Sequence, residues 1–169
     1  MIIQVSAGKG LGPTKMAAFD AALQAAGTAN YNLIRLSSII PAGSKVVESE
    51  GPISKLDGQW GDRLYVVMAE TRVNTHNMEA WAGIGWVQDE ESGRGLFVEH
   101  EGANKASVVR DITQSLEALT SSRGMSFGPI NMKVTGATCD QEPVCALVIA
   151  VFQASDWKNM AGTKGSGLS

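Results

Sequence analysis

Residue types that would indicate a disulfide-rich, metal-binding or membrane-spanning protein are scarce in this sequence. Its 169 residues include 2 cysteines and 2 histidines, and Cys139 and Cys145 have no histidine nearby at metal-ligand spacing. We therefore expect free thiols and no metal. The longest apolar run, 144–152, is far shorter than the roughly 20 residues that a helix needs to cross a bilayer.

Positive charge is also limited. The formal net charge is -3, and no block of consecutive Lys or Arg occurs. Proteins that bind nucleic acid or an anionic membrane usually carry a basic patch, so we expect neither partner. The first residues lack a basic leader followed by a sustained apolar stretch. We therefore expect a cytoplasmic protein.

The pattern of apolar residues favours one α+β domain over 1–169. Hydrophobic residues make up 44% and charged residues 18%, as in folded soluble domains. We expect strands at 2–6, 31–36, 45–48, 63–71, 80–87, 96–101, 130–138 and 144–152, and helices between Thr14 and Gly27 and over 105–122. The middle strands should form an antiparallel meander and the last two a hairpin. We expect a mobile tail at 162–169.

Several glycines follow the first predicted strand, at Gly8, Gly10 and Gly12. A glycine-rich segment between a strand and a helix can bind phosphate. The spacing does not match G-x-G-x-x-G, and no Gly-Lys-Ser/Thr stands at the P-loop position. We therefore expect a turn beside a pocket, with the strand ending at Ser6.

Two consecutive serines, Ser37 and Ser38, follow an apolar strand and precede a proline. Such pairs usually only bond the local backbone. The whole run over 32–41, Asn-Leu-Ile-Arg-Leu-Ser-Ser-Ile-Ile-Pro, resembles the self-cleavage site of the pyruvoyl-dependent arginine decarboxylase family. Residues 18–23 and 99–102 resemble the same family.

This resemblance implies an autocatalytic enzyme. The Ser38 hydroxyl would attack the Ser37 carbonyl, and the chain would separate into 1–37 and 38–169 with a pyruvoyl group derived from Ser38. The ketone would form a Schiff base with L-arginine, which would lose CO2 to give agmatine. The resemblance also implies a four-layer αββα sandwich with mostly antiparallel sheets, assembled as a homotrimer or a dimer of trimers with sites between subunits.

Four further residues receive roles from the resemblance. Asn32 would stabilise the oxyanion during self-cleavage, and Glu99 would protonate the substrate carbanion. Asp20 would pair with the guanidinium, and Met16, one helical turn earlier, would line the aliphatic part of the substrate. Without the family, Asp20 would be a solvated helix residue and Asn32 a turn amide.

Other interpretations remain open at this stage. Glu99 and Glu101 could be two outward carboxylates on one strand face. The chain could decarboxylate another amino acid such as aspartate, although Asp20 would repel an acidic substrate. It could also be an uncleaved, non-enzymatic oligomer that binds a small cationic metabolite. His76 and His100 receive no role.

Overall fold

The computed structural model describes residues 1–158, so the tail expected at 162–169 lies outside the described residues. Within this range the chain forms two helices and nine strands. In chain order they are β1 (Ile2–Leu11), α1 (Lys15–Ala26), β2 (Asn32–Arg35), β3 (Ile39–Ile40), β4 (Lys45–Glu48), β5 (Arg63–Val73), β6 (Glu79–Gln88), β7 (Gly95–Gly102), α2 (Lys105–Arg123), β8 (Asn131–Thr138) and β9 (Val144–Ser155). The α+β class expected from the sequence is confirmed.

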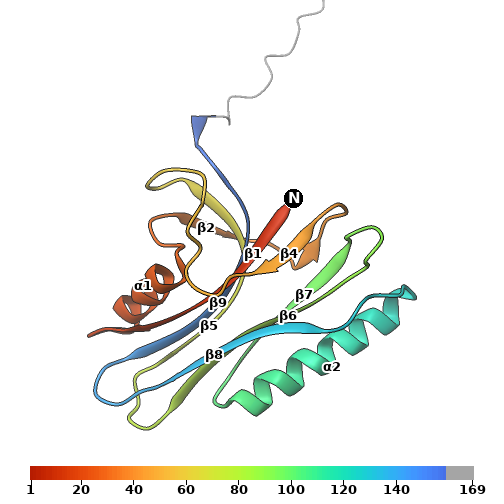
Figure 1. Ribbon diagram of the computed structural model, residues 1–169. Coiled ribbons are helices and arrows are strands. Elements are labelled where there is room, and N and C mark those ends of the chain that lie inside the picture. Colours follow the sequence, from red (N-terminus) through yellow and green to blue (C-terminus); the bar gives the residue numbers. More distant parts are fainter. Residues whose placement is uncertain (159–169) are drawn as a thin grey trace, which may run out of the picture.

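The strands form two sheets that pack face to face. One sheet has the order β2-β5-β9-β1-β4 and the other the order β3-β7-β6-β8. Helix α1 packs on the outer face of the five-stranded sheet, and α2 packs on the outer face of the four-stranded sheet. Figure 1 shows the two helices on opposite outer sides with the sheets between them.

Apolar side chains fill the space between these elements. The predicted apolar stripe of α2 is confirmed, because Val108, Ile112 and Leu116 are fully buried against the four-stranded sheet. The layer between the two sheets contains Ile3, Val67, Ile84, Phe97 and Val148, among others. This central layer fixes the distance between the sheets, because close-packed interiors resist changes in spacing.

Strand direction differs between the two sheets. All pairs in the four-stranded sheet are antiparallel. The five-stranded sheet is mixed: β1 pairs with β4 and β2 pairs with β5 in parallel, whereas β9 is antiparallel to both of its neighbours. The expectation of mostly antiparallel sheets therefore describes the four-stranded sheet fully and the five-stranded sheet only in its centre.

Two predicted strand pairings are wrong. Strands β8 and β9 lie in different sheets, so they form no hairpin, and β5 is separated in the same way from the β6–β7 hairpin. The run 144–152 is buried on both faces. Such a strand belongs in the centre of a covered sheet, whereas the partly exposed β8 suits an edge.

The glycine-rich stretch is also different from the expectation. Strand β1 does not end at Ser6 but continues through Gly8 and Gly10 to Leu11. A Cβ atom on Gly8 would lie 2.0 Å from the Ala22 carbonyl oxygen, and one on Gly10 would lie 2.0 Å from that of Ala18. The two glycines therefore allow α1 to lie directly on β1.

Helix α1 begins and ends where the sequence predicts, and α2 begins at the predicted residue and ends one residue later than predicted. Thr14 Oγ1 accepts a hydrogen bond from Ala17 N at 3.1 Å, and Asn104 Oδ1 accepts one from Ser107 N at 2.8 Å. Gly27 adopts the left-handed conformation, with φ of 78°, that commonly ends a helix. Neither helix, within residues 1–158, is long and apolar enough to cross a membrane.

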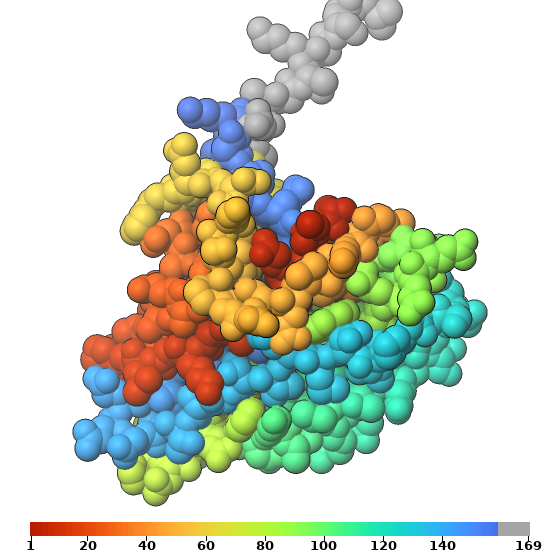
Figure 2. Space-filling model, viewed as in Figure 1, coloured from red at the N-terminus to blue at the C-terminus, as the bar shows by residue number. Residues whose placement is uncertain are grey.

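A side-chain contact joins the two sheets at the edge formed by β4 and β8. Lys133 Nζ on β8 lies 2.6 Å from Glu48 Oε1 and donates a hydrogen bond to the Ser49 carbonyl oxygen at 3.1 Å. The long connection from β4 to β5 follows. Figure 2 shows it in orange and yellow, crossing the surface between α1 and β8.

The contact between β1 and α1 leads to a first prediction. Gly10→Ala should destabilise the fold by about 1–3 kcal/mol, because its methyl group would overlap the Ala18 carbonyl. Gly51→Ala is the matched control, since a Cβ atom there meets nothing within 4 Å. Denaturant unfolding followed by circular dichroism measures both changes. Equal stability of the two variants would contradict the close approach of α1.

Candidate active site

The chain crosses from one sheet to the other at Ser37 and Ser38. Before them, Leu36 N still bonds to Val66 O of β5 at 2.8 Å. After them, Ser38 O accepts a hydrogen bond from Phe97 N of β7 at 2.8 Å. The two serines therefore link the five-stranded sheet to the four-stranded sheet.

Ser38 has an unusual backbone conformation at this crossing. Its φ is 52°, in the left-handed region that residues other than glycine seldom adopt. Such a conformation costs on the order of 1–3 kcal/mol and persists only where surrounding contacts hold it. Here the contacts on either side belong to different sheets, so the strain is concentrated at the Ser37–Ser38 junction.

Glu99 lies against the Ser38 side chain. Ser38 Oγ donates a hydrogen bond to Glu99 Oε1 at 2.6 Å, although the two residues are 61 positions apart in the chain. This length is typical of a hydroxyl bonded to a carboxylate. Both residues are partly buried. The pairing unites two of the sequence-predicted site residues and places a proton acceptor on the serine hydroxyl.

A cavity of about 460 Å³ opens beside this pair. It lies between β7 and α2, and its lining residues are Ser38, Phe97, Val98, Glu99, His100, Ser115, Ala118 and Leu119. His100 is a part of this wall, where its Nε2 lies 2.8 Å from Ser115 Oγ. The cavity is therefore large enough for a small molecule, and both Ser38 and Glu99 belong to its wall.

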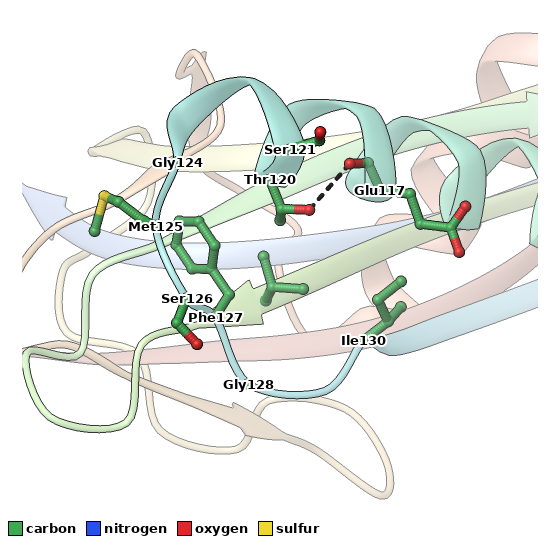
Figure 3. A pocket seen from close by; sticks show the side chains of 10 residues that line it. Glu117, Thr120, Ser121, Gly124, Met125, Ser126, Phe127, Gly128 and Ile130 are labelled. Atoms are coloured by element: carbon green, nitrogen blue, oxygen red, sulfur yellow. Dashed lines mark hydrogen bonds between the residues drawn. The ribbon is translucent and has the colours of Figure 1, made fainter.

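Another cavity of about 460 Å³ lies at the C-terminal end of α2. Figure 3 shows Glu117 and Thr120 on the helix and Met125 and Phe127 on the following loop around it. Neither Ser38 nor Glu99 lines this cavity. It therefore lacks the serine–carboxylate pair that distinguishes the cavity beside β7.

A group of charged residues lies near the site, where β5 approaches β7. Arg72 holds the Glu70 carboxylate through two hydrogen bonds, of 2.8 and 2.9 Å, and Arg35 lies 3.9 Å from it. Glu101 Oε1 accepts a hydrogen bond from the backbone N of Glu70 at 3.1 Å. Sequence reasoning did not identify Glu70 and Arg72; their spacing of two on one strand was the only available signal.

Asn32 and Ser37 occupy different places. Ser37 is exposed next to Ser38. Asn32 lies at the start of β2, where its Nδ2 donates a hydrogen bond to Gly61 O at 2.5 Å. Asn32 and Arg35 are three residue steps apart on an extended strand, about 10 Å. Within one chain, the Asn32 amide therefore lies at the far end of β2 from the serines.

Asp20 and Met16 lie on the outer surface of α1. Met16 is 64% exposed, and Asp20 is also exposed and accepts a hydrogen bond from Gln24 Nε2 at 2.6 Å. Neither residue lines the cavity beside Ser38. The neighbouring Phe19 ring lies 3.9 Å from the Arg72 guanidinium carbon. Helix α1 thus contacts the charged group but does not itself enter the cavity.

Neither cysteine lines the cavity beside Ser38, and His76 does not line it either. Burial raises the pKa of the Cys145 thiol to about 12, and the nearby Glu70 carboxylate adds to this effect. Cys139 is buried too. Within residues 1–158, no three His, Cys, Asp or Glu side chains are grouped so that they could hold a metal ion. His76 pairs with Asp140 on the surface.

Comparison with known proteins defines the class to which this chain belongs. The family model described as pyruvoyl-dependent arginine decarboxylase matches residues 2–156. The pyruvoyl-dependent arginine decarboxylase of Halobacterium salinarum is 34% identical over 158 residues, which cover 91% of this chain and 95% of that protein. The chain belongs to the pyruvoyl-dependent arginine decarboxylase family, whose members are carboxy-lyases.

Two further relatives carry the same description. Pyruvoyl-dependent arginine decarboxylase 2 of Archaeoglobus fulgidus is 33% identical over 146 residues, covering 86% of this chain and 91% of that protein. The enzyme of Thermococcus kodakarensis is 28% identical over 144 residues, covering 83% and 87%. The similarity thus extends over most of each chain and is not confined to the serine motif.

Proposed function

We propose that this chain cuts itself between Ser37 and Ser38, converts Ser38 into a pyruvoyl group and decarboxylates L-arginine to agmatine and CO2. The observation that carries the proposal is the 2.6 Å hydrogen bond from Ser38 Oγ to Glu99 Oε1. It joins the serine of the family motif to a carboxylate at a strained junction beside a cavity.

The hydrogen bond from Ser38 Oγ to Glu99 supports a self-cleavage route in which Glu99 is the base. Glu99 takes the hydroxyl proton while Ser38 Oγ attacks the Ser37 carbonyl carbon, so that an ester replaces the peptide bond and the Ser38 nitrogen becomes an amine. Loss of the Ser38 α-proton then breaks the Cβ–Oγ bond and releases Ser37 as a carboxylate. Water replaces the amine, which leaves as ammonia. Cleavage also removes the constraint that holds Ser38 at positive φ.

The residues around Ser38 suit a pyruvoyl group there. The Ser38 side chain adjoins an open cavity, and the same carboxylate that accepts its proton remains beside the Ser38 position. A ketone at this position supplies the electron sink that decarboxylation at an α-carbon requires. Glu99 is then the group that returns a proton to the substrate α-carbon.

We propose that the complete site lies between subunits of a homotrimer, or a dimer of trimers. Asn32, Met16 and Asp20 have family-assigned roles, yet in one chain they lie away from the cavity. In this arrangement a neighbouring copy supplies all three: Asn32 for the oxyanion, Met16 and Asp20 for the arginine side chain. The layer order α1, sheet, sheet, α2 supports the four-layer αββα sandwich, and the cytoplasmic location remains our expectation.

The experiment that tests the function is direct. Purified protein should separate into fragments 1–37 and 38–169, the larger fragment should react with a hydrazine at its ketone, and arginine should release CO2. Ser38→Ala should remain uncut and inactive because it lacks the attacking oxygen. Ser37→Ala is the matched control and should still cleave, because only its carbonyl reacts. If the wild-type chain stays uncut and contains no carbonyl, the proposal is wrong, and a non-enzymatic oligomer that binds a small cationic metabolite becomes the better interpretation.

Glu99 provides a second prediction. Glu99→Gln should slow self-cleavage and lower decarboxylation by roughly 10²- to 10⁴-fold, the usual contribution of a positioned acid or base. Both rates are measured, the second per mole of carbonyl formed. Glu117→Gln, in the cavity at the end of α2, is the matched control and should change neither rate. Normal turnover in processed Glu99→Gln protein would assign the proton to another group, with Glu101 the next carboxylate on the strand.

Asp20 determines the substrate in this proposal. Asp20→Asn keeps the side-chain shape and removes its charge, so kcat/KM for arginine should fall by an amount equivalent to roughly 1.5–3 kcal/mol, the scale of a hydrogen bond to a charged group. Turnover of the neutral analogue citrulline should fall less or increase. Equal losses for both substrates would indicate general damage to the pocket.

Mixed assemblies test whether Asp20 acts across subunits. Co-expressed Asp20→Asn and Ser38→Ala chains should regain arginine decarboxylation, because a cut Ser38 on one chain would meet an intact Asp20 on its neighbour. If activity in the mixture equals the sum of the two separate variants, each chain must supply its own Asp20.

A further inference from the structure

Both sheets have an open edge on the side of the molecule that carries Ser38. Strand β2 pairs with β5 only from Arg63 to Val66, and β3 pairs with β7 only at Gly95 and Leu96. Within residues 1–158, no strand pairs with the outer edges of β5 and β7 beyond these positions. An unpaired strand edge exposes backbone N–H and C=O groups that need other partners.

Glu101 connects these two edges. It lies two residues after Glu99 on β7, so both side chains occupy the same face, about 7 Å apart along the strand. Its Oε1 accepts the hydrogen bond from the backbone N of Glu70, on the open part of β5. One carboxylate of the four-stranded sheet thus satisfies an edge amide of the five-stranded sheet.

The β5 side of this contact is firmly held. The Glu70 side chain is 16% exposed, and Arg72 binds both of its carboxylate oxygens. Arg72 in turn lies over the Phe19 ring of α1. The amide that Glu101 binds therefore belongs to a segment fixed from the other side of its sheet, which makes it a suitable anchor.

Two hydrogen bonds flank Glu99 on β7, one beside the β3–β7 pairing of the four-stranded sheet and one between the two sheets. On one side, Phe97 N bonds to Ser38 O, and on the other, Glu101 bonds to Glu70 N. We propose that Glu101 is a positioning residue that holds the open sheet edges at the separation that keeps Glu99 on the Ser38 hydroxyl. The inference rests on the proposed function, because it concerns the residue that would move protons in both cleavage and decarboxylation.

The opposite edge of the sandwich provides a matched control. There, Lys133 of β8 joins Glu48 at 2.6 Å, again a charged side chain that connects the two sheets. Neither residue lines the cavity beside Ser38. Loss of this contact should loosen the sandwich to a comparable extent without changing the position of Glu99.

The experiment compares Glu101→Ala, Glu101→Gln, Glu101→Asp and Lys133→Met. It measures the rate of self-cleavage in newly synthesised chain, kcat and KM for arginine per mole of carbonyl, and the thermal unfolding temperature. Glu101→Ala should lower the cleavage rate and kcat roughly tenfold or more, because small displacements of reacting groups are costly. KM should stay within about twofold, since the substrate is not touched.

The two conservative variants distinguish the effect of the length of the Glu101 side chain from the effect of its charge. Glutamine keeps an acceptor oxygen at the same distance and should restore most of both rates. Aspartate keeps the charge but is one methylene shorter, so Glu101→Asp should be as slow as Glu101→Ala. If Glu101→Ala does not fold, Glu101→Asp takes its place in the comparison. Lys133→Met should lower the unfolding temperature while leaving the cleavage rate and kcat unchanged.

Other results would overturn the positioning role. A raised KM with unchanged kcat would mean that Glu101 contacts the substrate. If Glu101→Gln is as slow as Glu101→Ala, the charge or the proton of Glu101 is its essential property. Equal loss of kcat in Lys133→Met would indicate general loosening. If the wild-type chain neither cleaves nor decarboxylates arginine, the proposed function fails before any Glu101 variant is compared.

Discussion

The crossing of the chain between the two sheets at residues 36–38 is the constraint on which the site depends. Leu36 is still bonded to β5, and Ser38 is already bonded to β7. With the backbone held by a different sheet on each side, Ser38 adopts a conformation that its side chain disfavours, and its hydroxyl meets Glu99. The position of the reactive atoms is therefore set by the packing between the sheets, which depends on the whole central core.

The same crossing explains why charged residues gather at this edge. Because the chain leaves the five-stranded sheet after Leu36 and pairs only briefly with β7, both β5 and β7 have long edges with no strand partner among residues 1–158. Carboxylates and guanidinium groups can reach such edges without being fully buried, so the cost of desolvating them stays moderate. Glu70, Arg72 and Glu101 occupy this position. A strand edge that would otherwise invite non-specific pairing is thereby covered with charge.

Local patterns in the sequence predicted the helices, their caps and most strand segments, because these depend on residues two to four positions apart. They did not predict which sheet each strand joins. The apolar run 144–152 looked like half of a hairpin, and only its burial on both faces shows that it is a central strand. Strand β3 has two residues, too few to produce a periodic signal. Gly8 and Gly10 suggested a turn because the approach of α1 cannot be seen in sequence.

For the site, the sequence provided the residue identities but not their distances. The serine motif identified Ser38, and the resemblance singled out Glu99, which the structure places on the Ser38 hydroxyl. Asn32 is six positions before Ser38, and within one chain the extended strand β2 separates them. The role that the family resemblance gives Asn32 stays a prediction. No pattern distinguished Glu70 and Arg72 from other surface charges, because their importance comes from the neighbouring β7.

The position of β1 within the five-stranded sheet affects how the protein would refold after the proposed cut. The fragment 1–37 would contain β1, which lies between β9 and β4 inside the five-stranded sheet, and α1, which packs closely on it. The fragments would stay together as two interwoven chains. Folding, however, would have been completed by one continuous chain, in which both parts are always at high local concentration. Reassembly after full unfolding would be bimolecular, so the mature protein would depend on dilution in a way that its precursor does not.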